Sequence, residues 1–220
     1  MTVVLKVGGA VAADAAATIL ELAATNDLCV VHGAGPQISR EMTERGLAVQ
    51  FVGGRRVTSA AALVLVRRSL AGVNAVLCAA IGERAVGLLG DEIGLGATHV
   101  PALGHVGDPV PSRPPAVEIA LAQGAIPVVA PIAKGPLNVN ADEAAAALAV
   151  GLGADRILFV TDVSGVLLDG AVASTLAASD ADELLDTGAL DGGIVPKLRA
   201  AVTAARLGIR AEIGETAVVA

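Results

Sequence analysis

Short runs of apolar residues alternate with glycine turns and alanine-rich segments along most of the chain. The runs Thr2–Val7 and Leu28–His32 are apolar at nearly every position, as is typical of strands buried on both faces of a parallel sheet. The segments that follow them, about Ala13–Ala24 and a stretch ending near Gly46, predict helices. Strand, glycine turn and helix repeated in this way indicate βαβ units.

The alternation weakens in the middle of the chain and then resumes. Helical sequence at about Ser59–Glu83 precedes the glycine- and proline-rich segment Gly87–Pro115, whose weak strand patterns predict a hairpin and loops over a ligand. The elements predicted after it are a helix at Ala116–Gln123, a strand at Ile126–Ala130, a helix at Ala141–Gly151, a strand at Arg156–Thr161 and a final helix at about Ile194–Leu207. We therefore expect an α/β three-layer sandwich with a mainly parallel central sheet.

Length and composition suit one compact unit. A chain of 220 residues can bury a core without a disulfide or cofactor, and no repeat or low-complexity linker divides it, so we expect a single domain of two lobes that meet near Ala130. No stretch reaches the roughly 18 uncharged apolar residues of a spanning helix. The N-terminus also lacks the basic-then-apolar order of a secretory signal. We expect a cytoplasmic protein without a membrane partner.

The charge and the rare residue types narrow the possible ligands. A net charge of −7 argues against nucleic acid as a partner, because phosphate backbones require clustered Lys and Arg. Cys29 and Cys78 lie in apolar segments without metal-ligand spacing, which indicates buried free thiols and no zinc site. With Phe51 and Phe159 as the only aromatic residues, a nucleotide base would have to lie between aliphatic side chains.

Lys6 interrupts an apolar strand just before Gly8 and Gly9. Ligands collect at the carboxyl ends of parallel strands, and adjacent glycines let backbone N–H groups approach a phosphate closely. An edge-strand lysine that reaches out to water has the same pattern. The residues around Lys6 leave both interpretations open.

A second glycine turn, His32–Pro36, offers amide donors and a helix N-terminus to an anion. It lacks the dinucleotide fingerprint, because Ile38 replaces the third glycine and no acidic residue follows about 20 positions later. His32 is expected to pack or form hydrogen bonds rather than act as a base.

Downstream, Arg55 and Arg56 are candidates for a two-pronged bond to a carboxylate. Adjacent arginines are also common on surface loops, and that interpretation suits Arg55 better.

Further polar residues precede the last two major helices. Of Asn138 and Asn140, we expect one to cap or brace the helix and the other to face a ligand, while Asp142 would orient a lysine or lie near magnesium. Lys197 lies in the first turns of the last helix, where a cation is disfavoured unless an anion binds. Two lysines, an acid and several glycine turns are the set that phosphoryl transfer between anions needs.

A series of short motifs runs in order from Lys6 to about Gly208. They are LKVGG at Leu5–Gly9, VHGAGP at Val31–Pro36, GRRVT at Gly54–Thr58, GVN at Gly72–Asn74, GLLGD at Gly87–Asp91, GHVG at Gly104–Gly107, NVNADEAA at Asn138–Ala145, TDVSGVL at Thr161–Leu167 and GGIVPK at Gly192–Lys197. In wording and order they resemble the acetylglutamate kinases of the amino-acid kinase family. Such an ordered series is far more specific than any one motif.

The resemblance implies ATP-dependent phosphorylation of the γ-carboxylate of N-acetyl-L-glutamate, in arginine synthesis. Lys6 and Lys197 would stabilise the transferring phosphoryl group while Asp142 holds the lysines. The ionised carboxylate attacks directly, so neither a general base nor a covalent nucleophile is needed. ATP and Mg²⁺ are implied, without assigned metal ligands. The implied acyl-substrate contacts are Ala34, Gly35, Arg56, Asn138 and Asn140, and the implied ATP contacts are Gly8, Gly9, Asp162, Val163, Ser164, Gly165, Val166 and Leu167.

The resemblance also implies an acyl-substrate and dimerisation lobe at about 1–130 and a nucleotide lobe at about 131–220. It suggests a homodimer joined through the first lobe. Longer arginine-sensitive relatives form hexamers through an extra N-terminal helix, whereas this chain begins directly at its first strand. We therefore expect a dimer without arginine feedback.

Two features depart from the family pattern. Ala34 stands in what is usually an all-glycine turn, and its methyl group would crowd an acyl chain or change the φ angle, which leaves open another N-acylated or carrier-linked substrate such as aminoadipate. The chain stops at Ala220, so Gly214–Val219 is either a shortened closing strand or the nucleotide lobe lacks its edge. The shortening leaves a non-catalytic regulatory protein as an alternative.

Overall fold

The computed structural model describes residues 1–9, 15–160, 164–168, 170–188, 190 and 192–220. Its central sheet is formed by β1 (Thr2–Val7), β2 (Asp27–His32), β5 (Ala85–Leu89), β8 (Ile126–Ala130), β11 (Arg156–Phe159), β14 (Thr175–Ala177), β15 (Arg210–Ile213) and β16 (Thr216–Val219). The eight strands lie in the order β14-β16-β15-β11-β1-β2-β8-β5. All neighbouring pairs are parallel except β15 and β16, so the predicted mainly parallel sheet is confirmed.

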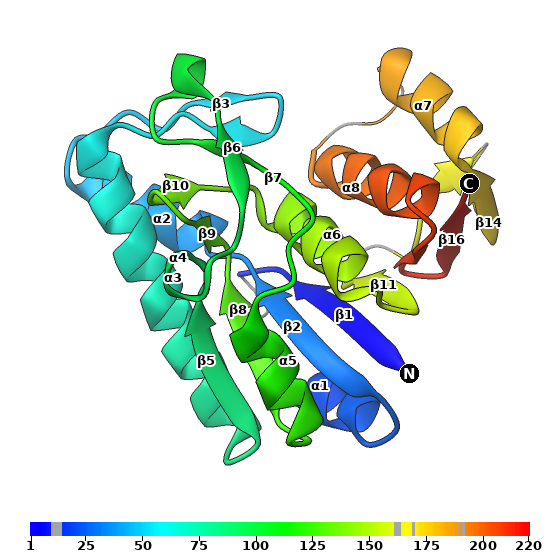
Figure 1. The fold of residues 1–220 in the computed structure, drawn as a ribbon. Helices are drawn as coiled ribbons and strands as arrows, with labels where there is room; N and C mark the ends of the chain where they lie inside the picture. The colour runs from blue at the N-terminus through cyan, green and yellow to red at the C-terminus, as the bar shows by residue number, and fades with distance from the viewer. Residues whose placement is uncertain (10–14, 161–163, 169, 189, 191) are drawn as a thin grey trace.

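Helices cover both faces of this sheet (Figure 1). The described helices are α1 (Ala16–Ala23), α2 (Gly35–Glu44), α3 (Ala60–Ile81), α4 (Gly90–Ile93), α5 (Pro115–Ala122), α6 (Ala141–Leu152), α7 (Ala178–Asp186) and α8 (Ile194–Arg206). Short antiparallel ribbons complete the fold: β3 (Phe51–Val52) with β4 (Arg55–Arg56), β6 (Ala97–His99) with β7 (Gly107–Pro109), β9 (Ile132–Ala133) with β10 (Leu137–Asn138), and β12 (Leu167–Leu168) with β13 (Ala171–Val172). The three-layer sandwich is confirmed.

Alternate residues of β1 meet different helical layers. Leu5 packs in one core cluster with Ile19 of α1 and Leu77 of α3, whereas Val4 packs in the other with residues of α5, α6 and α8. Side chains two positions apart on a strand share a face. Lys6 therefore points to the same side as Val4, toward α6.

The alanine content of α6 follows from its place between the sheet and α8. The run Ala144–Ala149 is buried along its whole length, and small side chains there let α6 approach β1 and α8 closely. Asn140 caps the helix, since its side chain accepts hydrogen bonds from the backbone N–H groups of Asp142 and Glu143.

The irregular middle segment begins later than predicted. Ala85–Leu89 forms β5, an edge strand parallel to β8, although Gly87 weakens its strand pattern. Glycine is required there because α3 lies close: an added Cβ would stand 2.4 Å from Oδ1 of Asn74. The rest of the segment includes the predicted hairpin, β6 with β7, and α7 is a further helix that the sequence pattern did not predict.

The C-terminal segment closes the sheet. β16 pairs antiparallel with β15 and parallel with β14, so Gly214–Val219 turns back as a hairpin and gives the sheet another strand. The alternative in which this lobe lacks its edge is therefore wrong. The first residues of the predicted helix at Ala13–Ala24, up to Asp14, and the last residue of the predicted strand at Arg156–Thr161 lie outside the described residues.

Within the described residues, α3 alone has the length and hydropathy that would allow it to cross a membrane. One side of α3 is a core face: Val66, Leu70 and Leu77 are buried, and the helix packs against β5, β8 and α2. This arrangement is that of a core helix. Val64 and Val76 on its outer side are 67% and 57% exposed.

Candidate active site

A cavity of about 480 Å³ opens where β1, β2 and β8 end. The residues that directly follow these strands, Gly8, Gly33 and Pro131, all lie in its wall. The structure also brings ten of the sequence-predicted site residues to this wall: Lys6, Gly8, Gly9, Ala34, Gly35, Arg56, Asn138, Asn140, Asp142 and Lys197. The cavity thus lies at the carboxyl ends of the strands, where ligands of parallel α/β folds bind.

Asp142 lies between the two predicted lysines. Its Oδ1 atom is 2.8 Å from Nζ of Lys6 and 3.8 Å from Nζ of Lys197. Lys6 and Asp142 are each only 5% exposed, and charges so deeply buried require a partner. Nζ of Lys197 also donates to the carbonyl oxygen of Gly193, at 3.3 Å, one turn earlier in α8. The carboxylate therefore orients both ammonium groups at one side of the cavity.

The glycine turns after β1 and β2 touch each other. A Cβ added at Gly9 would lie 2.7 Å from the carbonyl oxygen of Gly33 and 2.8 Å from Cα of Ala34, so no side chain fits at position 9. The side chain of Gln37 reaches back and donates to the carbonyl oxygen of Gly9, at 2.9 Å. The first turn of α2 therefore braces the glycine pair.

Ala34 has a negative φ angle. It has φ −143° and ψ 25°, and this negative φ is accessible to any L-residue. The prediction that its methyl group would crowd an acyl chain or change the φ angle of the turn stays a prediction. Ala34 is 3% exposed and packs with Ile38 and Met42, so alanine is accommodated in the turn.

Arg56 enters the cavity wall from β4. Its guanidinium donates to the carbonyl oxygen of Gly35 at 3.1 Å and to Oγ of Ser39 at 2.8 Å, and it stacks 4.6 Å from the ring centroid of Phe51. Burial lowers the pKa of Arg56, yet an arginine stays charged in proteins. Its partners in the described part of the chain include no carboxylate. An anionic ligand would therefore compensate the desolvated charge.

Asn140 has the expected capping role, and the expectation that one asparagine faces a ligand stays a prediction. Asn140 caps α6, and Asn138, buried at the rim, donates from Nδ2 to Oγ1 of Thr58 at 3.0 Å. The Thr58 hydroxyl in turn donates to the backbone oxygen of Arg56 at 2.7 Å. Asn138 thereby braces the strand that carries Arg56, while both asparagines line the cavity.

His32 is a packed histidine, as expected. Burial lowers its pKa to about 4, so the ring is neutral at ordinary pH. Its Nε2 lies 3.1 Å from Nδ2 of Asn74, and its Nδ1 lies 3.3 Å from the carbonyl oxygen of Gly33. Cys29 is buried and Cys78 partly buried, both as free thiols, and burial raises the pKa of Cys29 to about 12.

The predicted ATP contacts separate into two places. Gly8 and Gly9 lie in the cavity wall, whereas Ser164, Gly165 and Val166 lie beside the β15–β16 hairpin and Leu167 pairs with Val172 of β13. There the Val166 N–H donates to Oγ1 of Thr216 at 2.8 Å, and Leu167 is 56% exposed. Asp162 and Val163 lie outside the described residues.

Sequence reasoning did not assign a role at this site to Phe51, and it favoured a surface loop for Arg55. Phe51 covers Arg56, and as one of two phenylalanines in a chain without Trp or Tyr it carried a compositional signal. Arg55, assigned more readily to a surface loop, forms ion pairs with Asp108 and Glu143. Among the described residues, no three His, Cys, Asp or Glu side chains gather as a metal site.

Comparison with known proteins gives this geometry a family context. The sequence profile of the amino acid kinase family matches residues 1–215. An acetylglutamate kinase of Roseiflexus castenholzii is 42% identical, with 96% of this chain and 87% of that protein covered. One of Rubrobacter xylanophilus is 41% identical, with 96% and 88% covered.

Solved structures agree with the family match. A Streptococcus mutans protein superposes with a TM-score of 0.87 at 30% identity, with 99% of this chain and 98% of that chain covered. A carbamate kinase of Giardia lamblia has the same fold, with a TM-score of 0.72 at 15% identity and coverage of 99% and 98%. The chain belongs to the amino acid kinase family.

Proposed function

We propose that this chain is an ATP-dependent kinase that phosphorylates the γ-carboxylate of N-acetyl-L-glutamate, giving N-acetyl-L-glutamyl 5-phosphate and ADP in arginine biosynthesis. The observation that carries the proposal is the pairing of Asp142 with both Lys6 and Lys197 in the wall of the cavity. The relatives named acetylglutamate kinase, each covered over more than four fifths of its length, support this choice of substrate.

The proposed reaction uses the lysines for charge stabilisation. A γ-carboxylate oxygen of the substrate forms a bond to the γ-phosphorus of ATP as the bond to the β–γ bridging oxygen breaks, and ADP leaves with that electron pair. Lys6 and Lys197 would neutralise charge on the oxygens between which the phosphoryl group moves. Asp142 would hold both ammonium groups in place and take no proton, because the attacking carboxylate is already ionised at neutral pH.

The acyl substrate would lie on the side of the cavity formed by β4 and the second glycine turn. Arg56 is the proposed ligand of a substrate carboxylate, since it is buried and its partners in the described chain carry no charge. Backbone groups at Ala34 and Gly35 and the side chains of Asn138 and Asn140 would complete the contacts. This assignment makes residues 1–130 mainly the acyl-substrate lobe.

ATP would extend from Gly8 and Gly9 toward Ser164–Leu167, which belongs to the proposed nucleotide lobe at 131–220. The described residues do not form an acidic cage for Mg²⁺, and the carboxylate of Asp142 is paired with lysines. Mg²⁺ in such enzymes is held largely by substrate phosphates. We therefore assign no protein ligand to it.

The homodimer predicted through the first lobe stays a proposal, as does the cytoplasmic location. Support for the dimer comes from Val64 and Val76, which α3 exposes on its outer side. Sedimentation velocity of the purified protein would test it, and a single species at monomer mass would contradict it.

The function is tested by trapping the acyl phosphate with hydroxylamine in the presence of MgATP and N-acetyl-L-glutamate. Wild-type protein should give hydroxamate, and Lys6→Ala and Lys197→Ala should give little. Parallel reactions with N-acetyl-aminoadipate test the related substrate class. Absence of hydroxamate from folded protein that still binds ATP would overturn the proposal in favour of a regulatory role.

A further inference from the structure

Arg55 and Arg56 point to opposite sides of β4, as neighbours on a strand do. Arg56 contacts residues of α2. Arg55 lines the candidate active-site cavity as well, and it also contributes to a second, smaller cavity of about 140 Å³, whose wall includes Asp108, Glu143 and Arg199. This second cavity adjoins the candidate active site through β4.

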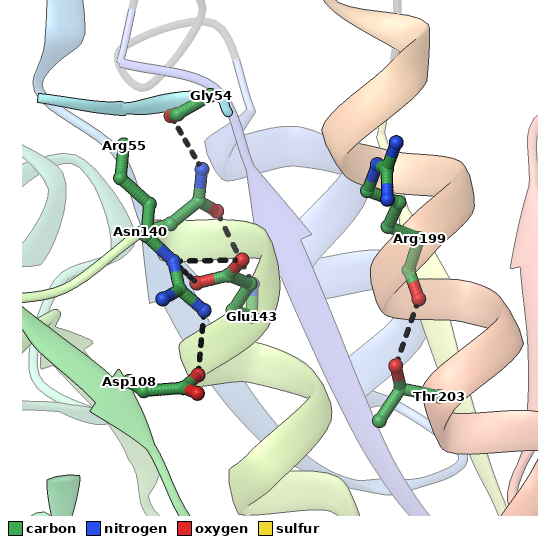
Figure 2. Close-up of polar contacts among 7 residues, drawn as sticks. All are labelled: Gly54, Arg55, Asp108, Asn140, Glu143, Arg199 and Thr203. Carbon is green, nitrogen blue, oxygen red and sulfur yellow. Dashed lines mark hydrogen bonds and ion pairs between the residues drawn. The ribbon is translucent and has the colours of Figure 1, made fainter. Parts of the chain in front are cut away.

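One guanidinium joins three elements of the fold. Nε of Arg55 lies 2.9 Å and 3.2 Å from the two carboxylate oxygens of Glu143 on α6, and Nη2 lies 2.5 Å from Oδ1 of Asp108 on β7. Figure 2 shows Arg55 between these two carboxylates. The Arg55 and Glu143 side chains are 21% and 23% exposed, so this pair is shielded more than an ordinary surface ion pair.

The hairpin that carries both arginines needs external support. β3 and β4 form a two-stranded ribbon of two residues each, separate from the central sheet. Its tip turns through Gly53 and Gly54, both with positive φ, and Phe51 and Val52 are about half exposed. A two-stranded hairpin is at best marginally stable by itself.

The support comes from the first turn of α6. Nδ2 of Asn140 donates to the carbonyl oxygen of Gly54 at 3.1 Å, and Glu143 accepts from Arg55 (Figure 2). Asn140 and Glu143 lie on either side of Asp142, the partner of Lys6 and Lys197. The position of the hairpin is thus tied to the helix turn that carries the lysine partner.

We propose that Arg55 is a positioning residue: its bonds to Glu143 and Asp108 hold β4 so that Arg56 stays in the cavity wall. This role rests on the proposed function for the identity of the acyl substrate. It does not require Arg55 to touch a ligand. Burial raises the pKa of Glu143, and the hydrogen bond and charge of Arg55 oppose that rise.

Arg55→Met tests the role, because it removes the charge and keeps most of the side-chain length. We expect the KM for the acyl substrate to rise about tenfold, as for the loss of a well-oriented binding group, while the KM for ATP changes less than about twofold. Arg55→Lys, which restores one charge without the fork, should recover part of the loss.

Arg199→Met is the matched control. Arg199 lies in the wall of the same second cavity, and its guanidinium forms no hydrogen bond or ion pair with another residue of the described chain. It should leave both KM values unchanged. If Arg55 only stabilised the fold, Arg55→Met would unfold at a lower temperature and both KM values would stay at the wild-type level. That result would overturn the proposal.

Hydrogen exchange of the intact protein separates this role from the proposed function. Backbone amides at 51–56 should exchange faster in Arg55→Met than in wild type or Arg199→Met, whatever the substrate is. Faster exchange in Arg55→Met, together with no hydroxamate from the wild type, would contradict the proposed function and support the role of Arg55 in the hairpin. If the wild type is active but exchange is unchanged in Arg55→Met, the proposed role of Arg55 in the hairpin is contradicted and the proposed function is not.

Discussion

Nζ of Lys6, near the end of β1, lies 2.8 Å from Oδ1 of Asp142 in the first turn of α6, and both residues are 5% exposed. A buried ion pair contributes little net stability. Removal of one partner, however, leaves the other charge unpaired in the protein interior, which destabilises the fold. Stability and catalysis therefore respond differently to substitutions of this pair.

Asp142→Asn should lower the free energy of unfolding by about 3 kcal/mol, because Lys6 loses its nearest carboxylate. It should also lower kcat by about 100-fold or more through misplaced ammonium groups. Lys6→Met combined with Asp142→Asn should recover much of the stability and none of the activity. Urea unfolding and the hydroxamate assay measure the two effects, and equal recovery of both would contradict the assigned roles.

Arg56→Lys should weaken acyl-substrate binding by about tenfold or more, since an ammonium group cannot reproduce a two-pronged bond to a carboxylate. The KM for ATP should stay at its wild-type level. Arg45→Lys is a suitable control, because Arg45 is exposed and its side chain forms no hydrogen bond or ion pair within the described chain. Initial rates with each substrate varied in turn provide the test. A rise in the KM for ATP alone would contradict the assignment of Arg56 to the acyl-substrate site.

Gly9→Ala should abolish activity and destabilise the fold, because its Cβ would meet backbone atoms of Gly33 and Ala34 at less than 3.0 Å. Gly72→Ala is the matched control: a Cβ there has no neighbour within 4 Å, on α3. That change should raise stability by up to about 1 kcal/mol through helix propensity. Thermal unfolding of both variants distinguishes close packing from a general intolerance of substituted glycines.

His32 should make the protein acid-labile. Its pKa is about 4 in the fold against 6.5 for the free side chain, so its contribution to stability is present above pH 6.5 and is lost as pH falls toward 4. That loss amounts to about 3 kcal/mol. His32→Gln should flatten the dependence in this window, as measured by urea unfolding at several pH values. Parallel wild-type and variant curves would refute the assignment.

The order of the elements and the identity of the main chemical groups were readable from the sequence. Apolar runs predicted β1, β2 and β8, and the glycine turns after β1 and β2 lie with Lys6 at the same end of the sheet. Local pattern suffices there because burial on both faces of a parallel sheet demands apolar residues at every position.

Local pattern failed where a distant partner decides the structure. Gly87 weakens the strand signal of β5, yet it is the residue that allows Asn74 of α3 to approach. The sequence around Arg55 favours a surface arginine. Only the fold brings its side chain to Glu143, 88 positions away, and to Asp108, 53 positions away. Pairing across such separations depends on how the elements pack.

The sequence by itself thus determined the α/β order, the strand ends and the presence of two lysines, an acid and an arginine suited to phosphoryl transfer. The tertiary structure decided that Lys6 faces α6 and that Arg55 lines both cavities while Arg56 lines the first. It also supplied the contacts of Asp142 with both lysines that the family resemblance had implied. The reason is physical: residue type and periodicity act locally, whereas distances between side chains follow from packing of whole elements.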